Sequence, residues 1–422
     1  MADKFIIKGG APLNGIVEVA GYKNSAGACL AAALLTDEEV VLDNLPLVED
    51  ISKIVKILES MGTEISWLEK RKIKVKAGPG VNVEKMDLGP VAETRVSVLL
   101  IGSLISRFGK FKICHPGGDR IGVRPITTHL EALKKLGAKI TIEDDFYIFD
   151  GGNLKGKEVV LKEFSVTATE NVMMAAVTAP GKTIIKGAAT EPQIQDLGFL
   201  LKKMGARIAG LGTNTILIEG VERLRGTSHK IIPDLIEAGT FISAGALIPG
   251  SSVEVRNLIP EHLDIFLDKL EEIGVCLEKG RDFIKVKYSP DLKAVRVQAL
   301  PYPGFPTDLL PIIIPLLTQA KGKSLIHDPL YENRFNYIQE LKKMGADIEI
   351  VDPHRAFIYG KTPLRGLRIE SWDIRAGASL VLAGLIADGK TMIENVYQID
   401  RGYEKIEERL QKLGADIKRV NI

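Results

Sequence analysis

The sequence has little cysteine, almost no excess of either charge and no long uncharged apolar run. Its three cysteines, Cys29, Cys114 and Cys276, are an odd number in 422 residues, which argues against a disulfide framework and fits a reducing compartment. Against 54 acidic residues stand 56 basic ones, so nothing global favours a nucleic acid or an acidic membrane as a partner. Any site for an anion must therefore be local.

Signals for membranes and metals are missing as well. No run of about eighteen uncharged apolar residues occurs, and the opening MADKFIIKGG lacks the apolar core of a secretion signal. The six histidines form neither an HExxH motif nor a cluster with the cysteines. We therefore expect a cytoplasmic protein with no membrane segment and no protein-held metal.

The chain does have the length and composition of a two-domain globular protein. Its 422 residues exceed the size at which one hydrophobic core stops growing. Hydrophobic residues make up 45% and charged residues 26%, without a block of like charge, which is typical of a folded protein.

A sixfold repeat organises the sequence. Segments such as KKLGAKI, KKMGARI and QKLGADI recur about every seventy residues. Their glycines are Gly62, Gly137, Gly205, Gly274, Gly345 and Gly414. Each segment predicts a helix that ends at glycine and is followed by a strand. A second marker, a small-residue apolar helix, a turn glycine and a β-branched strand, recurs with Gly109, Gly181, Gly250, Gly322 and Gly389. Each repeat should thus bury one helix and expose another.

The buried helices are predicted to start near a polar residue in five of six repeats. The starting positions are Asn24, Arg95, Thr167, Ile236, Asp308 and Arg375. Helix N-termini attract anions, so several of them aimed at one place would trap an anion. The alternative is that each polar residue simply caps its own helix.

The stretch GLIADGKT (384–391) matches the phosphate-loop pattern, but we reject that interpretation. The motif requires a strand before it and a helix after it. Here an apolar helix is predicted before it and the strand TMIENV after it, so a repeat turn explains it better.

Charged motifs stand between the repeated elements. Arginines occur in AETRVSV (Arg95), IGVRPIT (Arg124), YENRFNY (Arg334), WDIRAGA (Arg375) and QIDRGYE (Arg401). A surface salt bridge would explain any one of them. As a set, they suggest a substrate with both phosphate and carboxylate groups, which the guanidinium fork suits. In HPGGDRIGVRP (115–125), Gly117 and Gly118 allow a tight turn or a close approach to a ligand.

The motifs GYKNSAG, PGGDRIGVRP, FPTDLLP, YENRFNY, DIRAGASLVLAG and IDRGYEKIE, in this order, resemble the enolpyruvyl transferases over essentially the whole chain. The resemblance implies an α/β fold of two inside-out domains, each of three repeats with buried helices directed toward an interdomain cleft. One domain would combine residues 1–21 with 231–422, and the other would span 22–230 and carry the Asp119 loop.

The implied reaction transfers the enolpyruvyl group of phosphoenolpyruvate to the 3'-hydroxyl of UDP-N-acetylglucosamine through a tetrahedral ketal, with release of phosphate. This is the first committed step of peptidoglycan synthesis, on which the cell wall, cell shape and cell division depend. No cofactor or metal would be needed, and both partners would be small molecules. Three repeats per domain favour a monomer.

The resemblance also implies roles for individual residues. The catalytic residues would be Asp119, Lys23, Asp308 and Arg401, with Asp308 as the base for the acceptor hydroxyl. Phosphoenolpyruvate would contact Lys23, Asn24, Arg124, Arg334, Arg375 and Arg401. The UDP-sugar would contact Asn24, Arg95, Arg124, Pro125, Ile126, Thr127, Thr128, Ser165, Val166, Thr167, Asp308 and Leu330.

Asp119 stands where most of the family has a cysteine as the general acid, and some members carry aspartate there. The change implies insensitivity to fosfomycin, whose epoxide alkylates the thiol. An ordinary aspartate, with a pKa of about 3.9, is ionised at neutral pH, and the adjacent Arg120 favours the charge further. We therefore expect Asp119 to hold a proton only in the closed substrate complex. Cys114 alternates within the predicted strand FKICH and is not expected to replace the missing thiol.

Three other departures concern the acceptor. The family commonly has an aromatic residue at Leu99, a basic one at Glu163 and an arginine at Leu235. Another acceptor, such as shikimate 3-phosphate or a different nucleotide sugar, therefore stays open, as does a non-catalytic binding paralogue. ENRF and IDRGYE favour the sugar-nucleotide branch, and the joint presence of acid, base and anion-binding residues argues against a dead copy.

Overall fold

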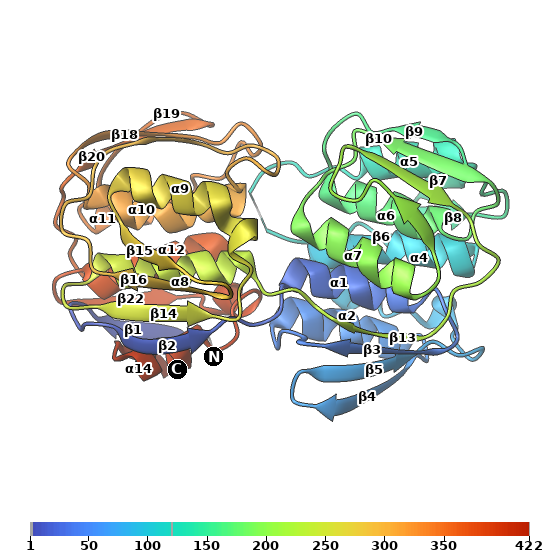
Figure 1. Cartoon of the computed structure of the whole chain (residues 1–422), viewed down its shortest axis with the longest axis horizontal. Coiled ribbons are helices and arrows are strands. Elements are labelled where there is room, and N and C mark those ends of the chain that lie inside the picture. The colour runs from blue at the N-terminus through green and yellow to red at the C-terminus, as the bar shows by residue number, and fades with distance from the viewer. Residues whose placement is uncertain (1–2, 120, 422) are drawn as a thin grey trace. The chain divides into compact units, whose positions relative to one another are not determined.

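The computed structural model describes residues 3–119 and 121–421, which form two compact units (Figure 1). Unit 1 contains residues 3–20, 119, 121–123 and 233–421, and unit 2 contains residues 21–118 and 124–232. The chain therefore passes from one unit to the other several times.

Unit 2 is made of three helix-and-sheet repeats. Its elements are α1 (Lys23–Ala33), β3 (Glu39–Asp43), α2 (Glu49–Ser60), β4 (Glu64–Glu69), β5 (Lys72–Lys76), α3 (Leu88–Glu93), the 3₁₀ turn η2 (Arg95–Leu99), α4 (Leu100–Arg107), β6 (Lys110–Cys114), α5 (Thr127–Leu136), β7 (Lys139–Glu143), β8 (Phe146–Asp150), β9 (Glu158–Val160), α6 (Val166–Ala176), β10 (Lys182–Lys186), α7 (Pro192–Lys203), β11 (Arg207–Ala209), β12 (Thr215–Glu219) and β13 (Thr227–Lys230). The described strands form the sheets β13-β3-β5-β4, β6-β8-β7 and β11-β12-β10-β9.

Unit 1 repeats the same plan. Its elements are β1 (Lys4–Lys8), β2 (Asn14–Glu18), α8 (Leu235–Leu247), β14 (Ser252–Arg256), α9 (Asp264–Ile273), β15 (Cys276–Lys279), β16 (Phe283–Lys287), β17 (Arg296–Gln298), the 3₁₀ turn η4 (Thr307–Leu309), α10 (Leu310–Thr318), β18 (Gly322–His327), α11 (Ile338–Lys343), β19 (Asp347–Asp352), β20 (Arg355–Gly360), β21 (Arg368–Glu370), α12 (Ile374–Ile386), β22 (Lys390–Glu394), α13 (Tyr397–Asp400), α14 (Ile406–Leu413) and β23 (Asp416–Val420). Its described sheets are β21-β22-β1-β23, β15-β16-β14-β2 and β17-β18-β20-β19.

The sheets lie outside and the apolar helices inside, as Figure 1 shows for α8 and α10 between two sheets of unit 1. Within each four-stranded sheet one strand is parallel to its neighbour, as β9 is to β10 across the α6 crossover, and the other pairs are antiparallel. Helices α1, α4, α6, α8, α10 and α12 are buried on nearly every side. The predicted fold class of two inside-out α/β domains with buried helices is confirmed.

The glycines that mark the repeats adopt the backbone that was expected of them. The six that follow the outer helices have φ between 91° and 113°. Glycine adopts this left-handed conformation at little cost, and a residue in this conformation ends a helix. The stretch 384–391 runs from α12 through Gly389 into β22, which confirms that it is a repeat turn.

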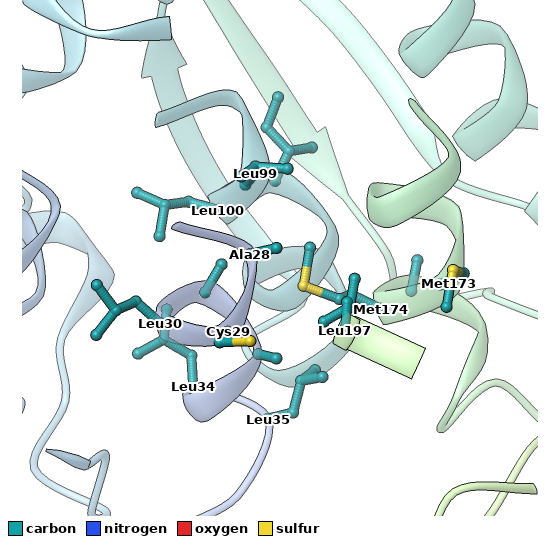
Figure 2. Close-up of a cluster of buried hydrophobic side chains, with 14 of the residues drawn as sticks. Ala28, Cys29, Leu30, Leu34, Leu35, Leu99, Leu100, Met173, Met174 and Leu197 are labelled. Atoms are coloured by element: carbon teal, nitrogen blue, oxygen red, sulfur yellow. The ribbon is translucent and has the colours of Figure 1, made fainter. Parts of the chain in front are cut away.

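Helix α1 illustrates why the inner helices can be buried. After Lys23 and Asn24 its sequence is SAGACLAAA, without a charged side chain, so every face can enter the core. Figure 2 shows Ala28, Cys29 and Leu30 of α1 packed with residues of α4, α6 and α7, among them Met174 and Leu197. A Cβ on Gly27 would lie 2.2 Å from Cγ1 of Val96, so a glycine is required for this approach.

Among the described residues, no helix combines the length and the apolar character that a membrane span requires.

Candidate active site

The charged residues singled out in the sequence fall into two groups, one in each unit. Unit 1 holds Asp119, Asp308, Leu330, Arg334, Arg375 and Arg401. Unit 2 holds Lys23, Asn24, Arg95, Arg124 to Thr128 and Ser165 to Thr167. Each group is described by itself.

In unit 1, the carboxylate of Asp308 is shared by two buried arginines. Its Oδ1 lies 2.7 Å from Nη2 of Arg334, and its Oδ2 lies 3.0 Å from Nε of Arg375. Arg334 is 2% exposed and is further held by the hydroxyl of Thr307 and by Asp328, 3.7 Å away. Asp308 itself lies in η4, at the start of α10, and its side chain remains 30% exposed.

This arrangement keeps Asp308 ionised. Burial raises the pKa of its carboxyl, but the charges of Arg375 and Arg334 outweigh burial and hold the pKa well below its ordinary value. Conversely, Asp308 and Asp373 raise the pKa of Arg334 despite its burial. Asp308 is therefore an anion that neutralises two cations and, in this state, a weak base.

A second carboxylate, Asp119, pairs with the third arginine of this group, Arg401. Its Oδ1 lies 2.5 Å from Nη1 of Arg401, which also donates to Oε1 of Gln398 at 2.9 Å. The following residues dock on the same unit, since the Val123 N–H donates to Glu332 Oε1 at 2.8 Å. These bonds group Asp119 and Val123 with unit 1, whereas we expected the Asp119 loop to belong to the domain spanning 22–230. Arg120 lies outside the described residues.

The two glycines before Asp119 have separate reasons to be glycine. A Cβ on Gly117 would lie 2.1 Å from the carbonyl oxygen of Ala92, which no side chain could tolerate. Gly118 has φ of 127°, and a Cβ there would also strike Cβ of Arg95 at 2.7 Å. Both glycines are thus explained by the close approach of Ala92 and Arg95 of the same unit, and the approach to a ligand stays a prediction.

In unit 2, Lys23 and Asn24 form the first residues of α1. The ammonium of Lys23, 7% exposed, lies 2.9 Å from Oδ2 of the buried Asp50, and the Asn24 amide donates to the Tyr22 hydroxyl at 3.2 Å. No side chain caps this helix terminus. The start of α1 thus presents backbone N–H groups beside a cation, which suits an anionic ligand.

Most of the residues expected to contact the UDP-sugar lie in two short segments of unit 2, residues 124–128 and 165–167. The Arg95 guanidinium donates to the Pro125 carbonyl at 3.4 Å, and Ser165 caps α6. The Thr167 hydroxyl lies 2.8 Å from Nε2 of His129. Ile126, however, is 1% exposed, so its side chain is part of the core and only its backbone is available. Arg124 is half-buried, Pro125 and Thr127 are exposed, and Thr128, Ser165 and Val166 are half-buried. In unit 1, Leu330 is 40% exposed.

Two of the three departures from the family pattern are core positions here. Leu99 is 3% exposed and packs beside α1 (Figure 2), and Leu235, the first residue of α8, is 6% exposed. Glu163 is exposed and accepts the Thr128 hydroxyl at 2.7 Å. Of the three, Glu163 is the one whose side chain reaches the surface of its unit.

Side-chain caps, the alternative to an anion trap, occur at the starts of α8 and α12. Asp234 accepts the N–H groups of Ile236 and Glu237 at the start of α8, and Asp373 does the same for Arg375 and Ala376 at the start of α12. These termini are thus already neutralised by their own carboxylates. The signal was in the sequence, since an aspartate stands directly before each helix.

The Asp234 cap makes stability depend on pH. Burial raises its pKa to about 6, against the opposing charge of Arg375. A carboxyl with a raised pKa binds its proton more tightly when folded, so its contribution to stability is greatest below pH 4 and falls as pH rises to 6.

Asp234→Asn retains the cap but cannot ionise. We expect its free energy of unfolding, relative to that of wild type, to rise by about 2–3 kcal/mol as the pH increases from 4 to 7. Chemical unfolding across this range measures the difference. Asp87→Asn, at the exposed cap of α3, is the matched control and should change the unfolding free energy by less than about 0.5 kcal/mol. A difference that does not change with pH would contradict the assignment.

Neither Cys114 nor Cys29 lies in surroundings that favour a thiolate. Cys114 ends β6, where its Sγ lies 3.7 Å from the Leu88 carbonyl and burial raises its pKa. Cys29 is fully buried, and burial raises its pKa as well. Its Sγ lies with Asp196 and His229 in a group whose ligand atoms are within 4.8 Å of one another. This grouping was not apparent from the spacing of cysteines and histidines.

Sequence reasoning also missed the partners of the predicted cations. They are Asp50 for Lys23, Gln398 for Arg401, and Thr307, Asp328 and Asp373 around Arg334. Asp373 and Asp50 begin helices, which was a usable signal. Asp328 lies at the end of β18 and shows no local pattern.

Six repeats with buried inner helices, and a group of charged residues in each unit, are the features of an enolpyruvyl transferase fold. Residues 7–410 match the family model described as EPSP synthase (3-phosphoshikimate 1-carboxyvinyltransferase). The chain belongs to this family.

Two named relatives and two solved structures are similar to this chain over nearly its whole length. The chain is 46% identical over 421 residues to UDP-N-acetylglucosamine 1-carboxyvinyltransferase of Koribacter versatilis, covering 99% of this chain and 96% of the relative. It is 44% identical to the protein of that name from Coxiella burnetii, with the same coverage. Among solved structures, the enolpyruvyl transferase NikO from Streptomyces tendae gives a TM-score of 0.91 at 25% identity, covering 100% of this chain and 99% of that one. EPSP synthase from Acinetobacter baumannii gives 0.75 at 20% identity, covering all of both chains, and is similar in fold.

Proposed function

We propose that this protein transfers the enolpyruvyl group of phosphoenolpyruvate to the 3'-hydroxyl of UDP-N-acetylglucosamine and releases phosphate. The observation that carries the proposal is the set of three buried arginines, Arg334, Arg375 and Arg401, neutralised by two carboxylates. Near-full-length relatives that carry the name of this activity support the choice of acceptor.

The substrate would replace carboxylates that now occupy the arginines. Phosphoenolpyruvate carries a phosphate and a carboxylate, and both suit the guanidinium fork. Once these groups pair with Arg401, Arg334 and Arg375, the side chains of Asp119 and Asp308 lose their strongest partners. Loss of its cation favours the protonated form of the Asp119 carboxyl, and loss of its two cations makes the Asp308 carboxylate a better base.

The protons then balance over two steps. In the addition, Asp119 gives its proton to C3 of phosphoenolpyruvate, the 3'-oxygen bonds to C2, and the hydroxyl proton passes to Asp308. In the elimination, a C3 proton returns to a carboxylate, the bond from C2 to the phosphate oxygen breaks, and phosphate leaves with the electron pair. Lys23 and Arg124 would stabilise the phosphate charge.

The sugar nucleotide would contact the segments around Arg95, Pro125 and Ser165 of unit 2. A different acceptor is favoured by one observation, the acidic Glu163 beside Thr128, where an anionic diphosphate would be repelled. We place the reaction in peptidoglycan synthesis in the cytoplasm and propose a monomer, because each unit has its own buried helices.

The proposal predicts phosphate release that depends on both substrates. Purified protein with phosphoenolpyruvate should release inorganic phosphate only when UDP-N-acetylglucosamine is added, and fosfomycin should leave the rate unchanged. A colorimetric phosphate assay measures this, with shikimate 3-phosphate as the competing acceptor. Phosphate release with shikimate 3-phosphate but not with UDP-N-acetylglucosamine would overturn the proposed acceptor. Absence of phosphate release with either acceptor would overturn the proposed activity.

A further inference from the structure

A buried carboxylate in unit 2 joins three segments that are distant in the sequence. Asp196 of α7 is 3% exposed and accepts the Ser25 hydroxyl from α1. It also accepts from Nε2 of His229 in β13 at 2.8 Å and from the Ile232 N–H at 3.3 Å. Three donors of different origin thus converge on one side chain, a role that needs the charge and both oxygens of a carboxylate.

A lysine fixes the direction of the hydrogen bond from His229. The Lys203 ammonium lies 3.3 Å from Nδ1 of His229. An ammonium can only donate, so Nδ1 accepts and Nε2 carries the hydrogen that faces Asp196. Lys203, His229 and Asp196 therefore form a directed chain from a cation to an anion. The ammonium also disfavours a metal ion at the neighbouring group of Cys29, Asp196 and His229, because both imidazole nitrogens are already used.

The group is located where it can set the position of Lys23. Ser25 lies in the first turn of α1, two residues after Lys23, and is fully buried. The helix has no side-chain cap at this end, and the Ser25 hydroxyl ties its first turn through Asp196 to α7 and β13. At the same end, the Tyr22 N–H donates to the Ile232 carbonyl at 2.7 Å.

We propose that Asp196, oriented by His229, is a positioning residue for Lys23. By holding Ser25 and Ile232 together, it places the first turn of α1, and with it the ammonium that meets the phosphate of phosphoenolpyruvate. The inference rests on the proposed function for its catalytic consequence, whereas its structural part stands alone. Without the carboxylate, a buried hydroxyl and a buried imidazole would lack their acceptor.

The test compares Asp196→Asn and Ser25→Ala with Ile216→Ala, a buried residue of β12 in the same unit that serves as the control for general destabilisation. Hydrogen exchange of the backbone amides of residues 22–28 tests whether Asp196 fixes the first turn of α1. We expect these amides to exchange at least about tenfold faster in Asp196→Asn, with a smaller effect in Ser25→Ala. Ile216→Ala should accelerate exchange without favouring this turn.

Steady-state kinetics tests whether Asp196 positions Lys23 for phosphoenolpyruvate. Asp196→Asn should raise the KM for phosphoenolpyruvate by about tenfold, equivalent to about 1.4 kcal/mol, and change kcat less. Exchange in residues 22–28 that matches wild type, or an effect equal to that of Ile216→Ala, would overturn the inference. Absence of phosphate release by the wild type would instead count against the proposed function, while the exchange result would still decide whether Asp196 positions α1.

Discussion

Asp119→Asn is expected to lose turnover by at least about 10²-fold, the lower end of what a general acid contributes, while binding of phosphoenolpyruvate is retained. The amide keeps the size of the side chain but carries no proton that it can give to carbon. It also removes the negative charge that lies 2.5 Å from Nη1 of Arg401. Calorimetric titration of phosphoenolpyruvate should therefore show equal or tighter binding, and phosphate release should fall to background.

Asp119→Cys separates the role of the acid from that of the charge. A thiol at this position should restore activity and make the enzyme sensitive to fosfomycin, because the epoxide alkylates a thiolate and not a carboxylate. The experiment belongs in a background with Cys114→Ser and Cys276→Ser, which leaves the buried Cys29 as the other thiol, so that mass spectrometry assigns the adduct to position 119. Wild type under the same treatment should carry no adduct. A Cys variant that is inactive and unmodified would show that position 119 is not the acid.

The repeats were predictable because they depend on local chemistry. A glycine after a lysine-rich helix needs a left-handed backbone wherever it occurs, so Gly62 and its five counterparts could be assigned from the sequence. The inner helices followed from their lack of charge, as in SAGACLAAA of α1. The phosphate-loop match was declined correctly for the same reason, because the order of elements around Gly389 is a local property.

The electrostatic partners were not predictable, because they depend on which distant segments meet. Asp308 and Arg375 are 67 residues apart, and Asp119 and Arg401 are 282 apart. The pattern indicated arginines suited to an anion but not that two carboxylates of the same site already neutralise them. The contacts of Asp119 and Val123 with unit 1 were not predictable for the same reason, since they depend on Arg401 and Glu332.

Asp308→Asn is expected to lower kcat by about 10²–10⁴-fold, because the hydroxyl of the acceptor loses its base. Phosphate release under saturating substrates measures the loss. The matched control is Asp291→Asn, which removes a carboxylate from an exposed pair with Lys321, 3.5 Å away, and should leave kcat unchanged. Retained kcat in Asp308→Asn would assign the base to another group.

The same substitution should also affect stability, with a pH dependence of known sign. Asn leaves Arg334, which is 2% exposed, with Asp328 as its nearest remaining carboxylate, so we expect a loss of about 1–3 kcal/mol, reduced because Asp308 is partly exposed. The pKa of Asp308 is held below its ordinary value, so the carboxylate stabilises the fold above about pH 4 and this contribution is lost as pH falls further. Unfolding free energies of wild type and variant should therefore differ by a constant amount from pH 5 to 8 and converge in acid. A gap that widens in acid would mean that Asp308 is protonated in the folded protein, and the ion pairs with Arg334 and Arg375 could not then be what holds the site together before substrate binds.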